Sequence, residues 1–176
     1  MVLYLVDGYL SYDCPCHVMA ETIIVRECRH GQVRVQFGNI IRVDGDIMVI
    51  PANNRLAGRE GLDERMQLAA GDELRARCTE IAVERRKEGK QPCGVGEAVS
   101  TSGYNLPAEN LVHVVAPDCR RPNQDNFRRE LLVNSYNAMF DEISKIEPRK
   151  TVVTPPLGMD VFCLLYTSPS PRDDIS

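Results

Sequence analysis

The chain has 176 residues, 43% of them hydrophobic, so it is the size of one domain and can form a packed core. Its formal net charge is −4 and its basic residues are scattered, which argues against the long phosphate-contacting surface of a nucleic-acid-binding protein. Seven cysteines, an odd number, indicate a reduced chain and therefore a cytoplasmic protein. The apolar N-terminal stretch contains Asp7 and is too short to cross a bilayer, so no membrane association is expected.

Residues 1–20 are predicted to form an irregular N-terminal extension, and Met19 stands just before the first patterned segment. A cluster of Cys and His residues starts within this extension, and these are the residue types that zinc prefers at short spacing. The cluster lacks a second matched pair, so an incidental tail is favoured over a metal site, and no metal ion or cofactor is predicted. The cluster consists of Cys14, Cys16 and His17, followed by Cys28 and His30.

Two strands are predicted next, at residues 23–25 and 33–37, because apolar side chains alternate with polar ones in the second. The stretch 38–71 then carries the clearest chemical signal. Its apolar run at 47–50 indicates a buried strand, followed by a glycine-punctuated loop and a helix from about residue 62 to 70. Open α/β sheets bind ligands where a strand's carboxyl end meets a helix start, since free backbone N–H groups there bind anions.

Asn53 and Asp63 lie on either side of that loop. An amide that donates and accepts, with a carboxylate that can take a proton from water, suits hydrolysis at a sugar carbon. Each residue also has a simpler interpretation. Asn53 would turn or cap the chain after Pro51, and Asp63 would place negative charge at the first turn of the helix.

The remaining elements follow from periodicity. A helix is predicted from Asp72, as its N-cap, to about Glu88, with a solvent-exposed charge cluster at 84–88. His113 falls in a strand between apolar residues, so a packed histidine is favoured over a catalytic one. A long helix at 126–145 and a buried strand at 151–154 complete the pattern. The core stripe of the long helix consists of Phe127, Leu131, Ser135, Met139 and Ile143.

Three blocks of the chain resemble the macro domain, the ADP-ribose-binding α/β module. Residues 38–40, 46–53, 56–63 and 69–71 read GNI, DIMVIPAN, LAGREGLD and AAG, against the family's G-D-I, D-A-I-V-N-A-A-N, L-x-G-G-G-G-V-D and A-A-G. Residues 97–117 resemble G-E-A-x-x-T-x-G-Y-x-L-P followed by V-I-H-T-V-G-P. Residues 155–162 correspond to the family's second phosphate loop.

The resemblance covers about residues 22–162 and implies an α/β fold, a three-layer α/β/α sandwich with a mixed central sheet. We therefore predict a macro domain at 21–162, with the last helix of the family missing. Residues 163–176 resemble a translated sequencing adapter, and the alternative is a Ser/Pro-rich disordered tail. Both interpretations predict no packed structure there.

Carried over position by position, the resemblance makes Asn53 and Asp63 the catalytic pair of an ADP-ribosyl hydrolase that acts on proteins or small metabolites. Asn53 would bond the distal ribose, and Asp63 would orient or activate water. Asn39 stands where the family has an aspartate that accepts from the adenine amino group. The implied ligand-binding residues are Asn39, Ile40, Ala52, Gly58, Arg59, Gly61, Leu62, Leu157, Gly158, Met159, Asp160, Val161 and Phe162.

Several positions depart from the family pattern. Arg59 and Glu60 replace loop glycines, so larger side chains cover the distal ribose, although Arg59 is also a candidate contact of the diphosphate. Gln67 stands where MacroD-type enzymes often have histidine, Ile50 replaces the first asparagine of the motif, and Asp160 replaces a glycine. A non-catalytic ADP-ribose-binding module is therefore the alternative. Binding of RNA or poly-ADP-ribose is disfavoured by the pI of about 5.4.

Overall fold

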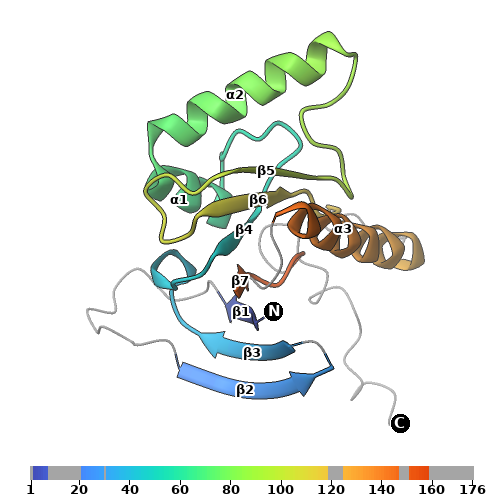
Figure 1. The fold of residues 1–176 in the computed structure, drawn as a ribbon. Coiled ribbons are helices and arrows are strands. Elements are labelled where there is room, and N and C mark those ends of the chain that lie inside the picture. The colour runs from blue at the N-terminus through green and yellow to red at the C-terminus, as the bar shows by residue number, and fades with distance from the viewer. Residues whose placement is uncertain (1, 8–20, 30, 119–124, 147–150, 159–176) are drawn as a thin grey trace.

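The computed structural model describes residues 2–7, 21–29, 31–118, 125–146 and 151–158, and the statements below concern these ranges. Strands and helices follow one another in groups along the chain rather than in strict alternation (Figure 1). The elements are β1 (Val2–Asp7), β2 (Glu21–Cys28), β3 (Gly31–Phe37), the short 3₁₀ helix η1 (Ile40–Arg42), β4 (Ile47–Pro51), α1 (Gly61–Ala70), α2 (Asp72–Lys87), β5 (Ala98–Ser102), β6 (Asn110–Val114), α3 (Asp125–Lys145) and β7 (Thr151–Thr154).

The strands form one seven-stranded mixed sheet in the order β2-β3-β1-β7-β4-β6-β5. Pairing is parallel from β3 through β1, β7 and β4 to β6. The edge strands β2 and β5 are antiparallel to their neighbours. The central strands carry almost continuous apolar runs because parallel strands are buried on both faces. The mixed sheet confirms this part of the predicted fold class.

The prediction that residues 1–20 are irregular is wrong for Val2–Asp7, which form β1 between β3 and β7. The run VLYLVD has the apolar and aromatic composition of a strand, and its partners lie far away along the chain. Without β1, β3 and β7 would present unpaired backbone groups to each other, so β1 joins the two halves of the sheet. Cys14, Cys16, His17 and the proposed tail at 163–176 lie outside the described residues.

Two hydrophobic cores lie on the two faces of the sheet. Met48 and Ile50 of β4 pack with α1 and α2, whereas Ile47 and Val49 pack with α3. Alternate side chains of a strand point to opposite faces, so α1 and α2 form one helical layer and α3 forms the other (Figure 1). This is the three-layer α/β/α sandwich that was expected. Among the described residues no helix covers β2, and its side chains from Ile24 to Arg29 are exposed.

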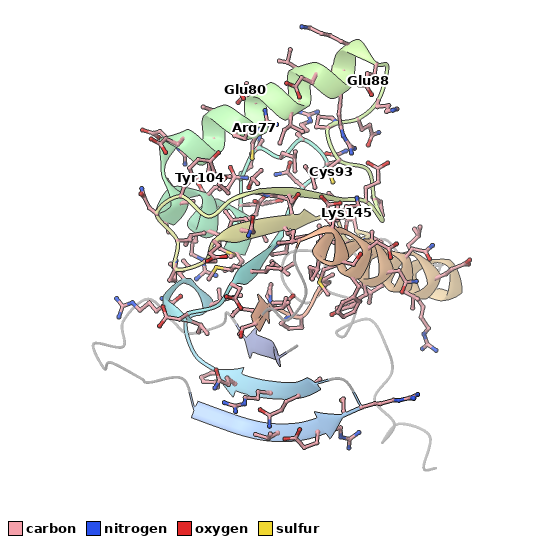
Figure 2. All side chains as sticks on the ribbon, in the orientation of Figure 1. Arg77, Glu80, Glu88, Cys93, Tyr104 and Lys145 are labelled. Carbon is pink, nitrogen blue, oxygen red and sulfur yellow. The ribbon has the colours of Figure 1, made fainter. Side chains whose placement is uncertain are left out.

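The helix ends differ slightly from the predictions. Asp72 is the first residue of α2 and not its N-cap. Gly71, with φ +95°, takes the cap position, and no side chain bonds the free N–H groups. Arg77 and Glu80 form a 3.0 Å ion pair along α2, and Glu88 lies at the far end of the helix (Figure 2). The predicted charge cluster is mostly exposed, except that Arg85 bonds Glu97 at 2.7 Å.

The prediction that His113 is a packed histidine is confirmed. Its side chain is 0% exposed, and its Nε2 lies 3.0 Å from the hydroxyl of Thr101 on the neighbouring strand. Its Nδ1 has no hydrogen-bond partner among the described residues. Burial lowers the pKa of His113 to about 4, so the ring is neutral near pH 7.

Candidate functional site

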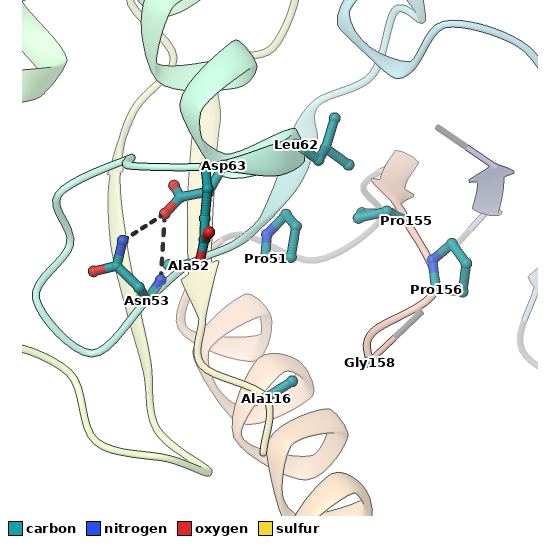
Figure 3. Close-up of a pocket in the computed structure, with 10 residues that line it drawn as sticks. Pro51, Ala52, Asn53, Leu62, Asp63, Ala116, Pro155, Pro156 and Gly158 are labelled. Atoms are coloured by element: carbon teal, nitrogen blue, oxygen red, sulfur yellow. Dashed lines mark hydrogen bonds between the residues drawn. The ribbon is translucent and has the colours of Figure 1, made fainter. Parts of the chain in front are cut away.

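Three adjacent parallel strands, β7, β4 and β6, end at one edge of the sheet, and the segments that follow them enclose a cleft. Carboxyl ends of parallel strands are where α/β sheets hold ligands. The cleft contains about 560 Å³ of empty space, part of it open to solvent. In Figure 3, Asn53 and Asp63 lie on one side and Pro155 and Pro156 on the other. The lining residues are Pro51, Ala52, Asn53, Glu60, Leu62, Asp63, Ala116, Pro155, Pro156 and Gly158.

Asn53 and Asp63 meet directly at the base of the loop that connects β4 to α1. The side-chain Nδ2 of Asn53 donates to Asp63 Oδ2 at 3.0 Å, and the backbone N–H of Asn53 donates to the same oxygen at 3.3 Å (Figure 3). The structure therefore brings together the two residues that were predicted as a pair. Their contact also closes the loop between them.

The other atom of the Asn53 side chain shapes the loop. Its Oδ1 accepts from the backbone N–H groups of Arg55 at 2.9 Å and Ala57 at 3.3 Å, so Asn53 turns the chain as its simpler interpretation held. One N–H of its amide is left without a partner in the described part of the chain. Asn53 is thus a turn residue with one donor available at the cleft.

Asp63 is 5% exposed and lies in the first turn of α1. Burial raises the pKa of Asp63 to about 6, and hydrogen bonds from Asn53, Gln67 and the backbone of Gly58 limit that rise. A carboxylate with a pKa near neutrality suits proton transfer at physiological pH. Three donors, two of them from Asn53, also occupy its acceptor positions.

Gln67, noted in the sequence only as a departure from the histidine of MacroD-type enzymes, is a buried part of the site. Its Nε2 donates to Asp63 Oδ1 at 3.1 Å and to the carbonyl of Leu56 at 3.4 Å. The available signal was spacing, because residues four apart on a helix lie on the same face, and Asp63 and Gln67 are four apart.

The comparisons with known proteins agree with this geometry. The family model for the Macro domain matches residues 49–167. This chain belongs to the macro domain family. It is 31% identical over 131 residues to a macro domain-containing protein of Mesorhizobium japonicum, covering 74% of this chain and 68% of the relative.

Two further similar proteins have descriptions that state an activity or a bound ligand. An O-acetyl-ADP-ribose deacetylase of Escherichia fergusonii is 30% identical over 133 residues, covering 74% of this chain and 70% of the relative. A mutant Oceanobacillus iheyensis macrodomain solved with ADPR is 25% identical, with a TM-score of 0.68, covering 83% of this chain and 74% of that one. The matched family region begins at residue 49 and ends at 167, so the boundaries predicted at 21 and 162 stay predictions.

Some residues expected to bind ligand lie at the cleft of this macro domain and others do not. Ala52, Leu62 and Gly158 line it. Gly58 and Arg59 lie in the loop between β4 and α1, and Gly61 is the first residue of α1. Asn39 is exposed and caps η1 by accepting from the N–H of Ile41 at 3.1 Å, and Ile40 is buried in the core beside α1. Neither residue is among those that line the cleft. Met159, Asp160, Val161 and Phe162 lie outside the described residues.

The second loop of the macro domain is held by α3. The hydroxyl of Tyr136 accepts from the backbone N–H of Leu157 at 3.0 Å, and Leu157 is buried. Gly158 follows with φ +77° and lines the cleft. Leu157 therefore anchors the loop rather than facing the cleft.

The cleft also contains residues that were not predicted to bind ligand. Pro51, Ala116, Pro155 and Pro156 are apolar lining residues that lie in the quoted motifs, and Glu60 adds a carboxylate.

No helix of the described ranges is long and apolar enough to cross a membrane. The described side chains contain no cluster of three or more His, Cys, Asp or Glu arranged to hold a metal ion.

Proposed function

We propose that this macro domain binds ADP-ribose in the cleft and hydrolyses ADP-ribosyl linkages of proteins or small metabolites. The observation that carries the proposal is the buried Asn53–Asp63 pair at the carboxyl edge of the sheet. Similarity to an O-acetyl-ADP-ribose deacetylase and to a macrodomain solved with ADPR supports the choice of ligand.

Binding would rest largely on backbone groups. The positive end of α1 and the backbone N–H of Gly158, in the loop after β7, can attract a diphosphate without Lys or Arg, which suits an acidic protein. The rest of that described loop contributes no N–H, because Pro155 and Pro156 have none and that of Leu157 is bonded to Tyr136. Asn53 would donate its remaining N–H to the distal ribose. The apolar lining, including Pro51, Leu62 and Ala116, would exclude water from the sugar.

Hydrolysis of an ester-linked substrate would proceed at the anomeric carbon. As the bond from this carbon to the leaving carboxylate breaks with its electron pair, positive charge of oxocarbenium type develops there. A water oxygen bonds to the carbon, and Asp63 accepts the water's proton before releasing it to solvent. Three hydrogen bonds from Asn53 and Gln67 already occupy the Asp63 carboxylate, so the water would take its remaining acceptor position.

The alternative function is ADP-ribose recognition without turnover. The three hydrogen bonds to Asp63 favour it, since a carboxylate held by several donors can position neighbouring groups without moving a proton. The bulky loop residues Arg59 and Glu60 also favour recognition without turnover, because they limit how closely the backbone approaches the ribose.

The decisive experiment compares Asp63→Ala and the shape-conserving Asp63→Asn with the unmodified protein. We expect both variants to lose about a hundredfold or more of turnover on an ester-linked ADP-ribosyl peptide, the usual effect of removing a general base. Affinity for ADP-ribose, measured by calorimetry, should change little. Unchanged turnover in folded variants would leave only the binding module, and absence of any heat on titrating ADP-ribose would remove both functions.

Two broader expectations belong to this proposal. Cytoplasmic location is supported by the free buried thiols of Cys78 and Cys93. Nucleic acid is not an expected ligand, because the net charge is −4.

A further inference from the structure

Gln67 is a buried polar side chain of α1 that the proposed chemistry does not use. It is 1% exposed and lies between the Asp63 carboxylate and the loop that precedes α1. Burying an amide is unfavourable unless its groups are hydrogen-bonded. The two hydrogen bonds that the Gln67 side chain donates both start from Nε2, one to Asp63 and one to Leu56, so both N–H groups of that nitrogen have an acceptor.

Leu56, whose carbonyl accepts one of these bonds, has an unusual backbone. Its φ is +55°, although it is not a glycine, and its side chain is 2% exposed. A left-handed conformation costs a residue with a side chain about 1–2 kcal/mol, so it persists only where neighbouring contacts hold it. The burial of Leu56 and the bond from Gln67 are such contacts.

Gly58 brings the loop directly onto Gln67. Its φ is +51°, and a Cβ atom added there would lie 2.5 Å from the Gln67 side chain. The backbone of Gly58 also acts to lower the pKa of the Asp63 carboxyl. Gln67 therefore contacts this loop in two ways, through its hydrogen bond to Leu56 and through close packing against Gly58.

We propose that Gln67 is a positioning residue that holds the Asp63 carboxylate and the loop from Leu56 to Gly58 as one unit. The inference deepens the proposed function and rests on it, because it concerns how the Asp63 site is prepared. A donor on Oδ1 favours the ionised carboxylate, which is the form that can accept a proton. The loop that approaches the ribose is fixed by the same side chain.

Other titratable groups surround Asp63. Cys78 of α2 is buried, and burial together with the Asp63 charge raises its pKa to about 11, so it stays a neutral thiol. Glu60 and Arg59 lie on the loop, and Glu64 follows on α1, all three exposed to solvent. Exposed charges are screened, so a change at Gln67 should dominate any change in the titration of Asp63.

The test is a titration of the Asp63 carboxyl by ¹³C NMR in the unmodified protein and in Gln67→Met, which keeps the side-chain length but has no donor. We expect the variant to titrate about half a pH unit or more higher, because one hydrogen bond to the ionised form is lost. Gln67→His, which restores a donor, should move the value back. Gln91→Met, at an exposed glutamine, is the control and should leave it unchanged.

These readouts do not depend on enzymatic activity. Where turnover is measurable, the acid limb of its pH profile should move upward in Gln67→Met with the NMR titration. If Asp63 titrates at a higher pH in Gln67→Met, but neither the unmodified protein nor any variant shows turnover, the hydrolase proposal is removed and the role of Gln67 is kept. If Gln67→Met folds and the Asp63 carboxyl titrates in it as in the unmodified protein, the role proposed for Gln67 is overturned. If Gln67→Met does not fold, the test passes to Gln67→His. A titration of Asp63 in Gln67→His that differs from that of the unmodified protein would then overturn the role.

Discussion

The side-chain amide of Asn53 donates to the carboxylate of Asp63 at 3.0 Å, although the whole loop between β4 and α1 separates the two residues in sequence. The bond closes the base of that loop. Each residue therefore has a structural role and a proposed chemical role at once, so a substitution at either residue will change stability as well as function. Matched control variants are needed to separate the two effects.

Asn53→Ala should weaken ADP-ribose binding by about tenfold or more, because it removes the donor proposed for the ribose and releases the turn at Arg55 and Ala57. The lost hydrogen bonds should also lower the free energy of unfolding by about 1–2 kcal/mol. Calorimetry and urea unfolding measure the two quantities. Asn54→Ala, at the exposed neighbour, should change neither, and equal affinities for the two variants would contradict the prediction.

Asp63 should make the protein relatively more stable as the pH falls. Its folded-state pKa of about 6 lies above the ordinary value, so its stabilising contribution is complete below the unfolded pKa near 4 and is lost as pH rises through 6. Between about pH 7.5 and 5, the unfolding free energy of the unmodified protein should gain about 1 kcal/mol relative to Asp63→Asn. Glu64→Gln, at an exposed carboxyl on the same helix, keeps Asp63 and should show the same gain relative to Asp63→Asn.

His113 should have the opposite effect in the same pH range. Burial lowers its folded-state pKa to about 4, so its contribution is complete above the unfolded pKa near 6.5 and is lost as pH falls through 4. The unfolding free energy of the unmodified protein should therefore fall by about 2 kcal/mol between about pH 7.5 and 5 because of His113. We expect this fall to be absent in His113→Gln, whose side chain can still bond Thr101. An identical pH dependence of urea unfolding with and without His113 would show that the ring does not resist protonation.

The parts of this fold that sequence predicts well are those with strong local patterns. The apolar run at 47–50, the helix stripe containing Ser135 and Met139, and the strand at 151–154 all form as expected. Asn53 and Asp63 could be paired because a strand's carboxyl end and a helix start are neighbours in α/β sheets. These inferences need only nearby residues or a general rule of topology.

The features that sequence could not provide depend on distant partners. Val2 pairs with Gln32 and Thr151, and nothing within residues 1–20 specifies either partner. Gln67 is of a polar residue type that is mostly exposed, so its burial becomes evident only once Leu56 and Gly58 are placed against it. The cap that Asn39 forms on η1 was not expected from the sequence either, and its assignment to the ligand stays a prediction.

Gly58→Ala should disturb the site more than its backbone angle alone explains. Gly58 and Gly89 both have positive φ, but an added Cβ at Gly89 meets nothing within 4 Å, whereas at Gly58 it meets Gln67 at 2.5 Å. Gly89→Ala should therefore lower the unfolding free energy by only about 1 kcal/mol, the effect of backbone strain. Gly58→Ala should lower it further and weaken ADP-ribose binding, and equal losses for the two variants would show that Gln67 moves aside freely.

Charge at Arg59 and Glu60 should tune affinity for the anionic diphosphate of ADP-ribose. Glu60 lines the cleft and Arg59 is its exposed neighbour, so the two side chains place opposite charges beside the ligand. Glu60→Gln should raise affinity about two- to fivefold and Arg59→Gln should lower it similarly, corresponding to the roughly 0.5–1 kcal/mol of exposed charge pairs. Both effects should shrink in calorimetric titrations at high salt, because mobile ions screen exposed charges. Effects that persist at high salt would indicate instead that these side chains act by covering the ribose.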